Sequence, residues 1–470
     1  MSNPSEINTQ PITSFEQMVA VLSNGIKPRQ DWRIGTEHEK FGFVLPSATD
    51  GAEKPAFSPP AYDHGGIRAV LTGMQNNGPE RWAPIMDGEN LIGLKGQGAN
   101  KGRSISLEPA GQFELSGAPL ATLHETHAEL HTHFQEVREV AQPLGLGFAP
   151  LGFHPENPRK AMPWMPKSRY AIMRRYMPLV GQLGLDMMTR TCTVQVNLDF
   201  SSEEDMRQKM QVAMAFQPVA TALFANSPFY EGQPNGLMSN RARIWTDTDN
   251  GRSGMPECFF SPDFSFATYV NWALDVPMYF IIRDGKMIDV AGCSFRAWLE
   301  GTPSPLLVGY SPTIGDFDDH LTTVFPEVRL KQFLEMRGAD AGSPEMMVAF
   351  SALWVGLLYD EVALKEAVGL AAGLSHQQCV AARLEVPQKG IGASLAGKPM
   401  RYWALRLLEL AEAGLKARGV KNAQGEDERQ YLAPLFSIAH GGKTQAEHWL
   451  ERFAGPWEHK AARIFMEAQI

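Results

Sequence analysis

The chain has 470 residues, of which 44% are hydrophobic and 20% charged, so it can bury a large core and is not a disordered protein. Its 43 basic and 52 acidic residues give a net charge of −9, which argues against nucleic-acid binding. No apolar run reaches the length of a membrane span, and the polar N-terminus has no apolar signal region. The four cysteines are too few for a disulfide framework. We therefore expect a cytoplasmic enzyme without membrane or nucleic-acid partners.

The predicted organisation is a short arm followed by one domain. Residues 1–12 are polar and are predicted to be a flexible arm. The rest of the chain, 13–470, contains no fixed repeat and no low-complexity linker, which favours a single domain. Its acidic, strand-rich part is predicted within about 33–340, and the part after 341 is predicted to be mainly helical.

Several segments alternate apolar and polar residues with the period of a strand. In 191–200, Cys192, Val194 and Val196 fall on one face, whereas Gln195 and Asn197 fall on the other. Shorter strands follow from the same pattern, and a hairpin is predicted around the Asp-Gly pair at 284–285. These strands are predicted at 33–43, 104–108, 112–115, 278–282, 286–290 and 333–337.

Helical patterns lie between and after these strands. The segment 120–140 has the composition of a long charged helix, and 401–418 carries an apolar stripe with helical spacing. No strand–helix–strand rhythm repeats along the chain, and the hairpin favours antiparallel pairing. The predicted fold class is therefore α+β rather than a doubly wound parallel sheet.

Acidic side chains recur on the polar faces of three predicted strands. Glu37 and Glu39 are two residues apart and share a face, as do Glu335 and Arg337. Glu108 and Glu114 flank a Pro-Ala-Gly break. Each carboxylate alone is compatible with a solvent-facing strand. Together on one sheet face they repel each other and need cations, so the pattern indicates Mg²⁺ or Mn²⁺ and a site that handles phosphate.

Three other features permit two interpretations each. The Gly-rich segment 93–104 lacks the spacing of a P-loop and is either a surface turn or a lid that brings Lys95 to phosphate. His124, His127, His131 and His133 crowd one helix, where a solvated surface is favoured over a zinc site. Trp245 is either a core residue or part of a pocket, and its charged flanks favour the pocket.

The acidic segments resemble a known family. RIGTEHEKFGF (33–43), SISLEPAGQFELSGAPL (104–120), LGLDMMTRTCTVQVNLDF (183–200) and FPEVRLKQFLEMRGAD (325–340) are similar to the plant-type glutamate–cysteine ligases, which also occur in bacteria. This resemblance implies a fold like that of glutamine synthetase, with a curved antiparallel sheet and helices outside. The implied reaction joins the γ-carboxylate of L-glutamate to the amine of L-cysteine through γ-glutamyl phosphate. It consumes ATP and is the first step of glutathione biosynthesis.

The resemblance also implies roles for individual residues. Glu37, Glu39, Glu108, Glu114 and Glu335 match the metal ligands, and Arg337 would contact the transferring phosphate with Glu335 as its catalytic neighbour. Gln195, Asn197 and Trp245 would line the substrate site, and Lys95 and Arg337 would bind the nucleotide. Arg190 and Arg241 are candidates for the glutamate α-carboxylate, because a guanidinium binds a carboxylate with two hydrogen bonds. The expected cofactor is Mg²⁺, with Mn²⁺ as an alternative, and the expected state is a monomer or weak homodimer.

Two other functions remain compatible with the sequence. A sister ligase that joins glutamate to another amine would carry the same acidic motifs. A non-catalytic regulator would keep the fold, although such a copy is expected to lose one or more of the five carboxylates or Arg337.

Overall fold

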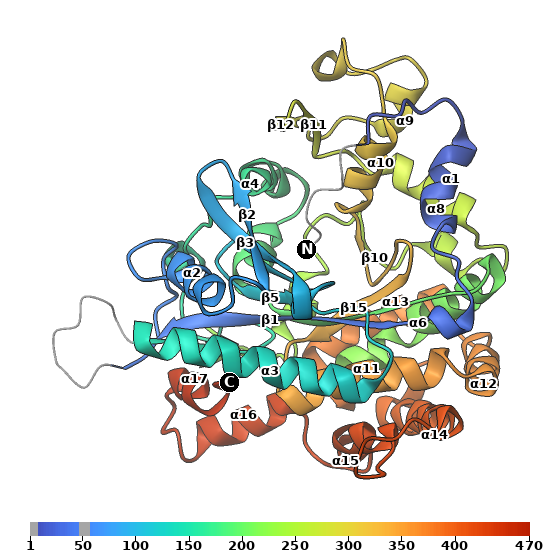
Figure 1. The fold of residues 1–470 in the computed structure, drawn as a ribbon. Helices are drawn as coiled ribbons and strands as arrows, with labels where there is room; N and C mark the ends of the chain where they lie inside the picture. Colours follow the sequence, from blue (N-terminus) through green and yellow to red (C-terminus); the bar gives the residue numbers. More distant parts are fainter. Residues whose placement is uncertain (1–7, 47–56) are drawn as a thin grey trace.

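The computed structural model describes residues 8–46 and 57–470 (Figure 1). Residues 1–7 of the predicted arm lie outside the described residues. Residues 8–12 are not free: the Ile12 amide donates to the Pro312 carbonyl at 3.1 Å, and the Ile314 amide donates to the Gln10 carbonyl at 2.9 Å. This end of the predicted arm is therefore bound to the start of helix α10 (Ile314–Leu321).

The centre of the molecule is a nine-stranded sheet in which every pairing is antiparallel. Its strands run in the order β14-β15-β7-β1-β5-β4-β3-β2, and β6 pairs with the far end of β1. Their bounds are β1 Ile34–Val44, β2 Trp82–Asp87, β3 Asn90–Gly96, β4 Ser104–Leu107, β5 Phe113–Ser116, β6 Leu146–Ala149, β7 Thr193–Leu198, β14 Val328–Leu330 and β15 Leu334–Asp340.

Short two-stranded sheets lie outside this central sheet. The predicted hairpin around 284–285 is confirmed, since Asp284 and Gly285 both have positive φ at the turn between β11 and β12. The bounds of these strands are β8 Phe229–Tyr230, β9 Gln233–Pro234, β10 Ser253–Gly254, β11 Phe280–Arg283, β12 Lys286–Asp289, β13 Phe325–Pro326, β16 Ser394–Leu395 and β17 Lys398–Pro399.

Helices cover both sides of the sheet, and both long helices predicted from the sequence are present. The helix predicted at 120–140 begins after Thr122, whose hydroxyl accepts from the Glu125 amide in a capping box. The helices are α1 Phe15–Ser23, α2 Ile67–Asn77, α3 Leu123–Ala141, α4 Ser168–Val180, α5 Gly184–Arg190, α6 Glu203–Leu223, α7 Asn240–Ile244, α8 Phe266–Asp275, α9 Phe295–Leu299, α10 Ile314–Leu321, α11 Pro344–Leu358, α12 Glu361–Ala371, α13 His376–Lys389, α14 Met400–Arg418, α15 Ala433–Ala439, α16 Gln445–Ala454 and α17 Ile464–Glu467.

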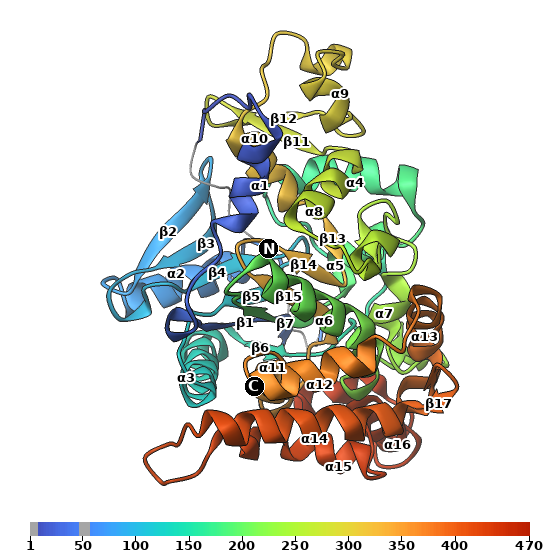
Figure 2. The same cartoon turned by 90° about the vertical axis from the view of Figure 1, so that its right-hand side faces the viewer.

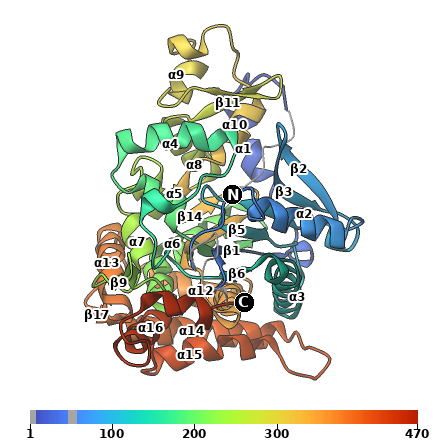
Figure 3. The same cartoon turned by 90° about the vertical axis from the view of Figure 1, so that its left-hand side faces the viewer.

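The helices form two layers of different character. In all three views, α3, α11, α14 and α15 lie on one side of the sheet, and α1, α8, α9, α10 and the β11–β12 hairpin lie on the other (Figures 1, 2 and 3). The first side is densely apolar: α11 is buried along most of its length and packs against α14, α3 and β7. The second side faces the polar residues of the strands. The predicted α+β class and antiparallel pairing are confirmed.

The strand pattern read from the sequence determines which face is core. On β7, the side chains of Val194, Val196 and Leu198 are fully buried in the main hydrophobic cluster, whereas Gln195 and Asn197 point to the opposite face. Cys192, just before this strand, is also buried in an apolar cluster. Within 8–46 and 57–470, no single helix is long and apolar enough to span a membrane. Only when α11 and α12 are taken together, across the sharp bend between them, do they have the length and apolar composition of a span.

Candidate functional site

Three glutamates meet on the polar face of the sheet. Glu39 on β1 lies directly opposite Glu114 on β5, and Glu108 follows β4. One carboxylate oxygen from each of the three lies within 4.8 Å of the others, and all three side chains are buried. We call these residues the acidic trio. Burial, and then the charges of Glu108 and Glu114, hold the pKa of Glu39 well above its usual range.

The turn that carries two members of the trio is fixed by Gln112. Its amide oxygen accepts from the Ala110 backbone at 2.9 Å, and its amide nitrogen donates to the Met188 and Thr191 carbonyls, each at 3.1 Å. The Glu108 amide closes the turn by donating to the Gln112 carbonyl at 2.9 Å. Gln112 therefore sets the spacing of Glu108 and Glu114, a role that the sequence pattern did not reveal.

Glu37 lies one step along β1 from the trio and faces a polar pair on β7. The Asn197 amide donates to the Glu37 carboxylate at 2.8 Å, and Gln195 is the cross-strand neighbour of Glu37. The prediction that Glu37, Gln195 and Asn197 share one polar face is confirmed.

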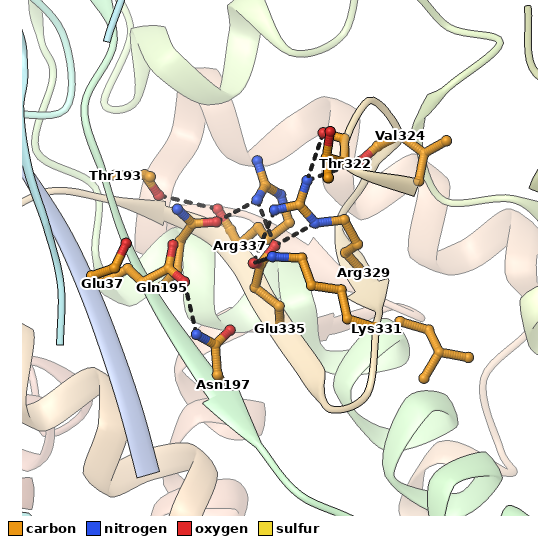
Figure 4. A network of polar contacts seen from close by, with 12 residues as sticks. Glu37, Thr193, Gln195, Asn197, Thr322, Val324, Arg329, Lys331, Glu335 and Arg337 are labelled. Carbon is orange, nitrogen blue, oxygen red and sulfur yellow. Dashed lines mark hydrogen bonds and ion pairs between the residues drawn. The ribbon is translucent and has the colours of Figure 1, made fainter. Parts of the chain in front are cut away.

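Glu335 on β15 lies at the centre of a basic cluster (Figure 4). Arg329 binds both of its oxygens, at 2.7 and 2.9 Å, while Lys331 and Arg337 contact one oxygen each, at 2.9 and 2.6 Å. Burial raises the pKa of Glu335, but the three basic side chains, Arg329 foremost, hold it well below its usual range. We call Glu335, Arg329, Lys331 and Arg337 the basic cluster. Arg337 also donates to Gln195.

Sequence reasoning missed Arg329 and Lys331. A usable signal existed, because Arg329 on β14 and Lys331 directly after it stand two apart in the segment RLKQFLEMR, so their side chains are expected on one face. Only the pairing of Arg329 with Glu335 across β14 and β15 places that face against the acidic side chain.

A small cavity of about 40 Å³ connects Glu39 and Glu108 of the acidic trio to two aromatic residues and two arginines. Arg241, Trp245, Phe325 and Arg337 line it, and the same four residues line an adjoining space. Trp245 packs edge-on against Phe325, with ring centres 5.9 Å apart. Trp245 thus lines the cavity and also packs against an apolar cluster, and its contact with a substrate stays a prediction.

Asp340 holds the helix that carries Arg241. Its buried carboxylate accepts from the Ser227 hydroxyl at 2.6 Å and from the Ser239 hydroxyl at 2.8 Å. Ser239 is the N-cap of α7, and the Arg241 amide donates to Ser227 at 3.2 Å. A side chain at Gly152 would place its Cβ 2.3 Å from the Asp340 carboxyl carbon, so only glycine fits there. Asp340 was not predicted, because nothing in the sequence indicates this convergence.

A second, larger cavity of about 940 Å³ borders the site. Lys95 lines it together with Lys101 and Arg103 of the Gly-rich segment, and Lys167 and Arg169 lie on the facing wall. Thr322 also lines this cavity and accepts from Arg329 through its carbonyl at 3.3 Å, so the cavity reaches the basic cluster. Lys95 thus lines a basic cavity, and its binding to the nucleotide stays a prediction. Lys167 and Arg169 come from a distant segment that spacing alone does not reveal.

Arg190 does not lie in either cavity. Its guanidinium binds Asp186 at 2.7 Å and Glu231 at 3.1 Å, and it contacts the rings of Phe153 and Tyr230. The side chain is almost fully buried and its hydrogen-bonding groups are used inside the protein. The prediction that Arg190 binds a substrate carboxylate is wrong, because the arginine stabilises the 153–231 region instead.

The donor set of the acidic trio fits a hard divalent cation. Mg²⁺ and Mn²⁺ prefer carboxylate oxygens, and three carboxylates buried this close repel one another unless a cation lies between them. Glu37 contributes a further carboxylate beside the trio. Glu335 is different, because its oxygens are occupied by the basic cluster.

An acidic trio, a basic cluster and a basic cavity on one antiparallel sheet are the components of a metal-dependent, phosphate-handling enzyme. The model of the glutamate–cysteine ligase family 2 (GCS2) matches residues 33–467. Chloroplastic glutamate–cysteine ligases from Nicotiana tabacum and Arabidopsis thaliana are 48% and 47% identical over 461 residues, covering 98% of this chain and 84% of each relative. A solved glutamate–cysteine ligase of Francisella tularensis in complex with AMP has a TM-score of 0.52 at 12% identity, over 93% of this chain and 87% of that one.

The chain belongs to the glutamate–cysteine ligase family 2. The predicted family, the glutamine-synthetase-like fold and the ligase activity in glutathione biosynthesis are confirmed. The predicted cytoplasmic location is contradicted by the comparison, because the similar proteins from tobacco, barrel medic, mustard, rice and Arabidopsis are named as chloroplastic.

Proposed function

We propose that the cavity between the acidic trio and the basic cluster is where ATP phosphorylates the γ-carboxylate of L-glutamate and L-cysteine then displaces phosphate. The products are γ-glutamylcysteine, ADP and phosphate. The observation that carries this assignment is the placement of two glutamates of the trio, Glu39 and Glu108, and two arginines, Arg241 and Arg337, around one cavity, with Glu114 directly opposite Glu39 in the sheet. The chain from 13 to 470 would act as one ligase domain, because strands from both halves of the sequence build the site.

Glu39, Glu108 and Glu114 would hold Mg²⁺, or Mn²⁺ in its place. When bound, the ion would neutralise phosphate and carboxylate oxygens that otherwise repel each other. Glu37 and Glu335 would form a second position once phosphate draws Arg337 and Lys331 away from the Glu335 carboxylate. Glu37 lies two residues before Glu39 on β1, and Glu335 lies on a different strand, β15. This separation from the trio supports two metal positions rather than one.

Arg241 would bind the α-carboxylate of glutamate. Its side chain lines the cavity with Glu39 and Glu108, and its guanidinium donates to the Arg337 carbonyl at 2.8 Å, which aims it across the cavity. Arg337 would stabilise the charge on the transferring phosphoryl group, with Glu335 and Gln195 orienting its guanidinium. Asn197 would hold Glu37 in place.

The larger cavity would receive ATP. Lys95, Lys101 and Arg103 supply positive charge for its phosphates, while Ile85, Phe280 and Ile282 offer apolar surface for a base. The Gly-rich segment is a turn in which the Gly96 amide donates to the Arg103 carbonyl at 2.9 Å. We propose that this turn closes over the phosphates and excludes water, which would otherwise hydrolyse the acyl phosphate.

The cysteine amine must be neutral to attack the acyl phosphate, so a carboxylate near the cavity would accept its proton. Trp245 and Phe325 line the small cavity and not the larger basic one, and they would pack against a small thiol side chain. The partners of the protein would be its three small substrates, ATP, L-glutamate and L-cysteine. The protein itself would be a monomer or a weak homodimer.

The direct experiment measures ADP release by the purified chain with Mg²⁺, ATP and L-glutamate, with and without L-cysteine. We expect cysteine-dependent ADP formation, matched by γ-glutamylcysteine in mass spectrometry. ADP release that depends on another amine instead would assign the chain to the sister reaction. Binding of ATP without turnover on any amine would overturn catalysis and support a regulator.

A further inference from the structure

Lys167 is a buried cation with few partners inside the protein. It lies in the loop before α4, as the N-cap residue of that helix, and is 7% exposed. Within 8–46 and 57–470, its Nζ makes a single hydrogen bond, to the Leu107 carbonyl at 3.4 Å. An ammonium group has three donors, and a buried charge without partners is costly, so the position suits an anionic ligand. We propose, building on the function proposed above, that Lys167 binds the γ-phosphoryl group of ATP while it is transferred to glutamate.

The loop that carries Lys167 is fixed on both sides of the lysine. Before it, the Met165 amide donates to the Pro109 carbonyl at 2.8 Å, in the turn between β4 and β5. After it, the Ser168 amide and hydroxyl donate to the Asp87 carboxylate at 2.6 and 2.9 Å. The lysine is therefore held in place before a ligand arrives, which lowers the entropic cost of binding.

Lys167 lies where the two cavities approach each other. Its side chain lines the larger cavity, whereas the carbonyl that it contacts belongs to Leu107. The next residue, Glu108, lines the small cavity together with Arg337. A phosphoryl group that passes from ATP in the larger cavity to glutamate in the small one therefore contacts Lys167 on the nucleotide side and Arg337 on the glutamate side.

The cations of the Gly-rich segment are less suited to this position. Lys95 and Lys101 are exposed, so water screens their charge. Arg103 is already bound to the Glu129 carboxylate at 2.6 Å. Lys167 differs from all three, because it is both buried and left without a carboxylate partner among the described residues.

The chemistry of the transfer explains what a buried ammonium contributes. The bond between the γ-phosphorus and the oxygen that bridges it to the β-phosphate breaks, and its electron pair stays on ADP. A new bond joins the γ-phosphorus to an oxygen of the glutamate γ-carboxylate. Lys167 keeps its proton throughout and donates to a γ-phosphoryl oxygen, whose negative charge it stabilises in the transition state.

The test compares two nucleotides that differ in the γ-phosphate. Binding of AMPPNP, a non-hydrolysable analogue of ATP, and of ADP would be measured by calorimetry on the full chain with Mg²⁺. In Lys167→Met, we expect AMPPNP to bind roughly tenfold more weakly or worse, ADP to change by less than about twofold, and kcat to fall by about 10²-fold. Lys160→Met, at an exposed lysine outside both cavities, should match the unmodified chain in all three.

Thermal unfolding without nucleotide separates this role from a structural one. Burial lowers the pKa of Lys167, so its charged form is disfavoured in the folded chain and Lys167→Met should melt no lower than the unmodified chain. A lower melting temperature with equal weakening of AMPPNP and ADP would assign Lys167 a structural role and overturn the proposal, as would unchanged AMPPNP binding. Absence of cysteine-dependent ADP release by the unmodified chain would instead reject the proposed function, and the comparison of the two nucleotides does not depend on turnover.

Discussion

The acidic trio and the basic cluster place buried carboxylates in opposite electrostatic settings only two strands apart. Glu39, Glu108 and Glu114 face one another, so burial and mutual repulsion raise the pKa values of Glu39 and Glu108. Glu335 is held by Arg329, Lys331 and Arg337, and its pKa is lowered. Burial and neighbouring carboxylates therefore disfavour the charged forms of Glu39 and Glu108, whereas three basic side chains stabilise the charged form of Glu335. This difference supports the proposal that the trio binds metal and the basic cluster binds phosphate.

The largest effect is expected from the trio itself. Replacing Glu114 with Gln removes a charged ligand while keeping the shape of the side chain. We expect kcat to fall by roughly 10³-fold, because charge stabilisation by the metal is lost. Steady-state ADP release measures this, and Glu412→Gln, at an exposed glutamate on α14, is the matched control that should keep full activity. Retention of kcat in Glu114→Gln would place the metal elsewhere.

The second-largest effect is expected from Arg337 of the basic cluster. Arg337→Ala should lower kcat by about 10²–10³-fold, since the transferring phosphoryl group loses its guanidinium. Arg337→Lys should recover only part of the activity, because an ammonium cannot donate to Gln195 and phosphate in the same fork geometry. Pre-steady-state measurement of ADP formation separates this loss from slow product release. An Arg337→Ala variant with a normal burst would contradict the assignment.

A smaller effect is expected from the support of the cavity wall. In Asp340→Asn, one acceptor for the Ser227 and Ser239 hydroxyls becomes a donor, so α7 and Arg241 should lose their fixed position. We expect the KM for glutamate to rise roughly tenfold with a smaller change in kcat. Circular dichroism should confirm the native fold. If only the KM for ATP changes, Asp340 supports the larger cavity instead of the position of Arg241, and the prediction is contradicted.

The smallest effects concern stability and have opposite signs for the two clusters. A carboxyl group whose pKa is raised by folding is destabilising when ionised, so Glu39→Gln should raise the melting temperature of the metal-free chain at pH 7.5. This gain should shrink as the pH falls and Glu39 itself takes up a proton. Glu335→Gln should instead lower the free energy of unfolding by about 3 kcal/mol, because three basic side chains lose their partner. Thermal unfolding in the presence of a chelator measures both changes in stability. If both variants become more stable, or both less stable, the contrast between the two clusters is contradicted.

Much of this arrangement follows from the period of the strands. Alternation alone places Glu37 and Glu39 on one face and Gln195 and Asn197 on another polar face, and the pairing of β1 with β5 and β7 brings these faces together. Arg190 shows where this reasoning fails. Its residue type suits a substrate carboxylate, but only the fold reveals that Asp186 and Glu231 already occupy its guanidinium.

Residues that act through the path of the chain could not be predicted. Asp340 acquires its role because Ser227 and Ser239, more than 100 residues earlier, return to the end of β15. Lys167 similarly reaches the larger basic cavity from the loop before α4. Neither residue has a periodic or motif signal, since the contacts depend on loops rather than on strand register.

The most direct test of the central claim is Mn²⁺ binding, followed by electron paramagnetic resonance in the absence of nucleotide. The unmodified chain, Glu114→Gln and Glu335→Gln would be titrated side by side. We predict that Glu114→Gln loses tight Mn²⁺ binding and that Glu335→Gln retains it, because the trio binds the ion before phosphate arrives. Loss of binding in Glu335→Gln to the same degree as in Glu114→Gln would show that the two clusters form one metal site and would contradict the account.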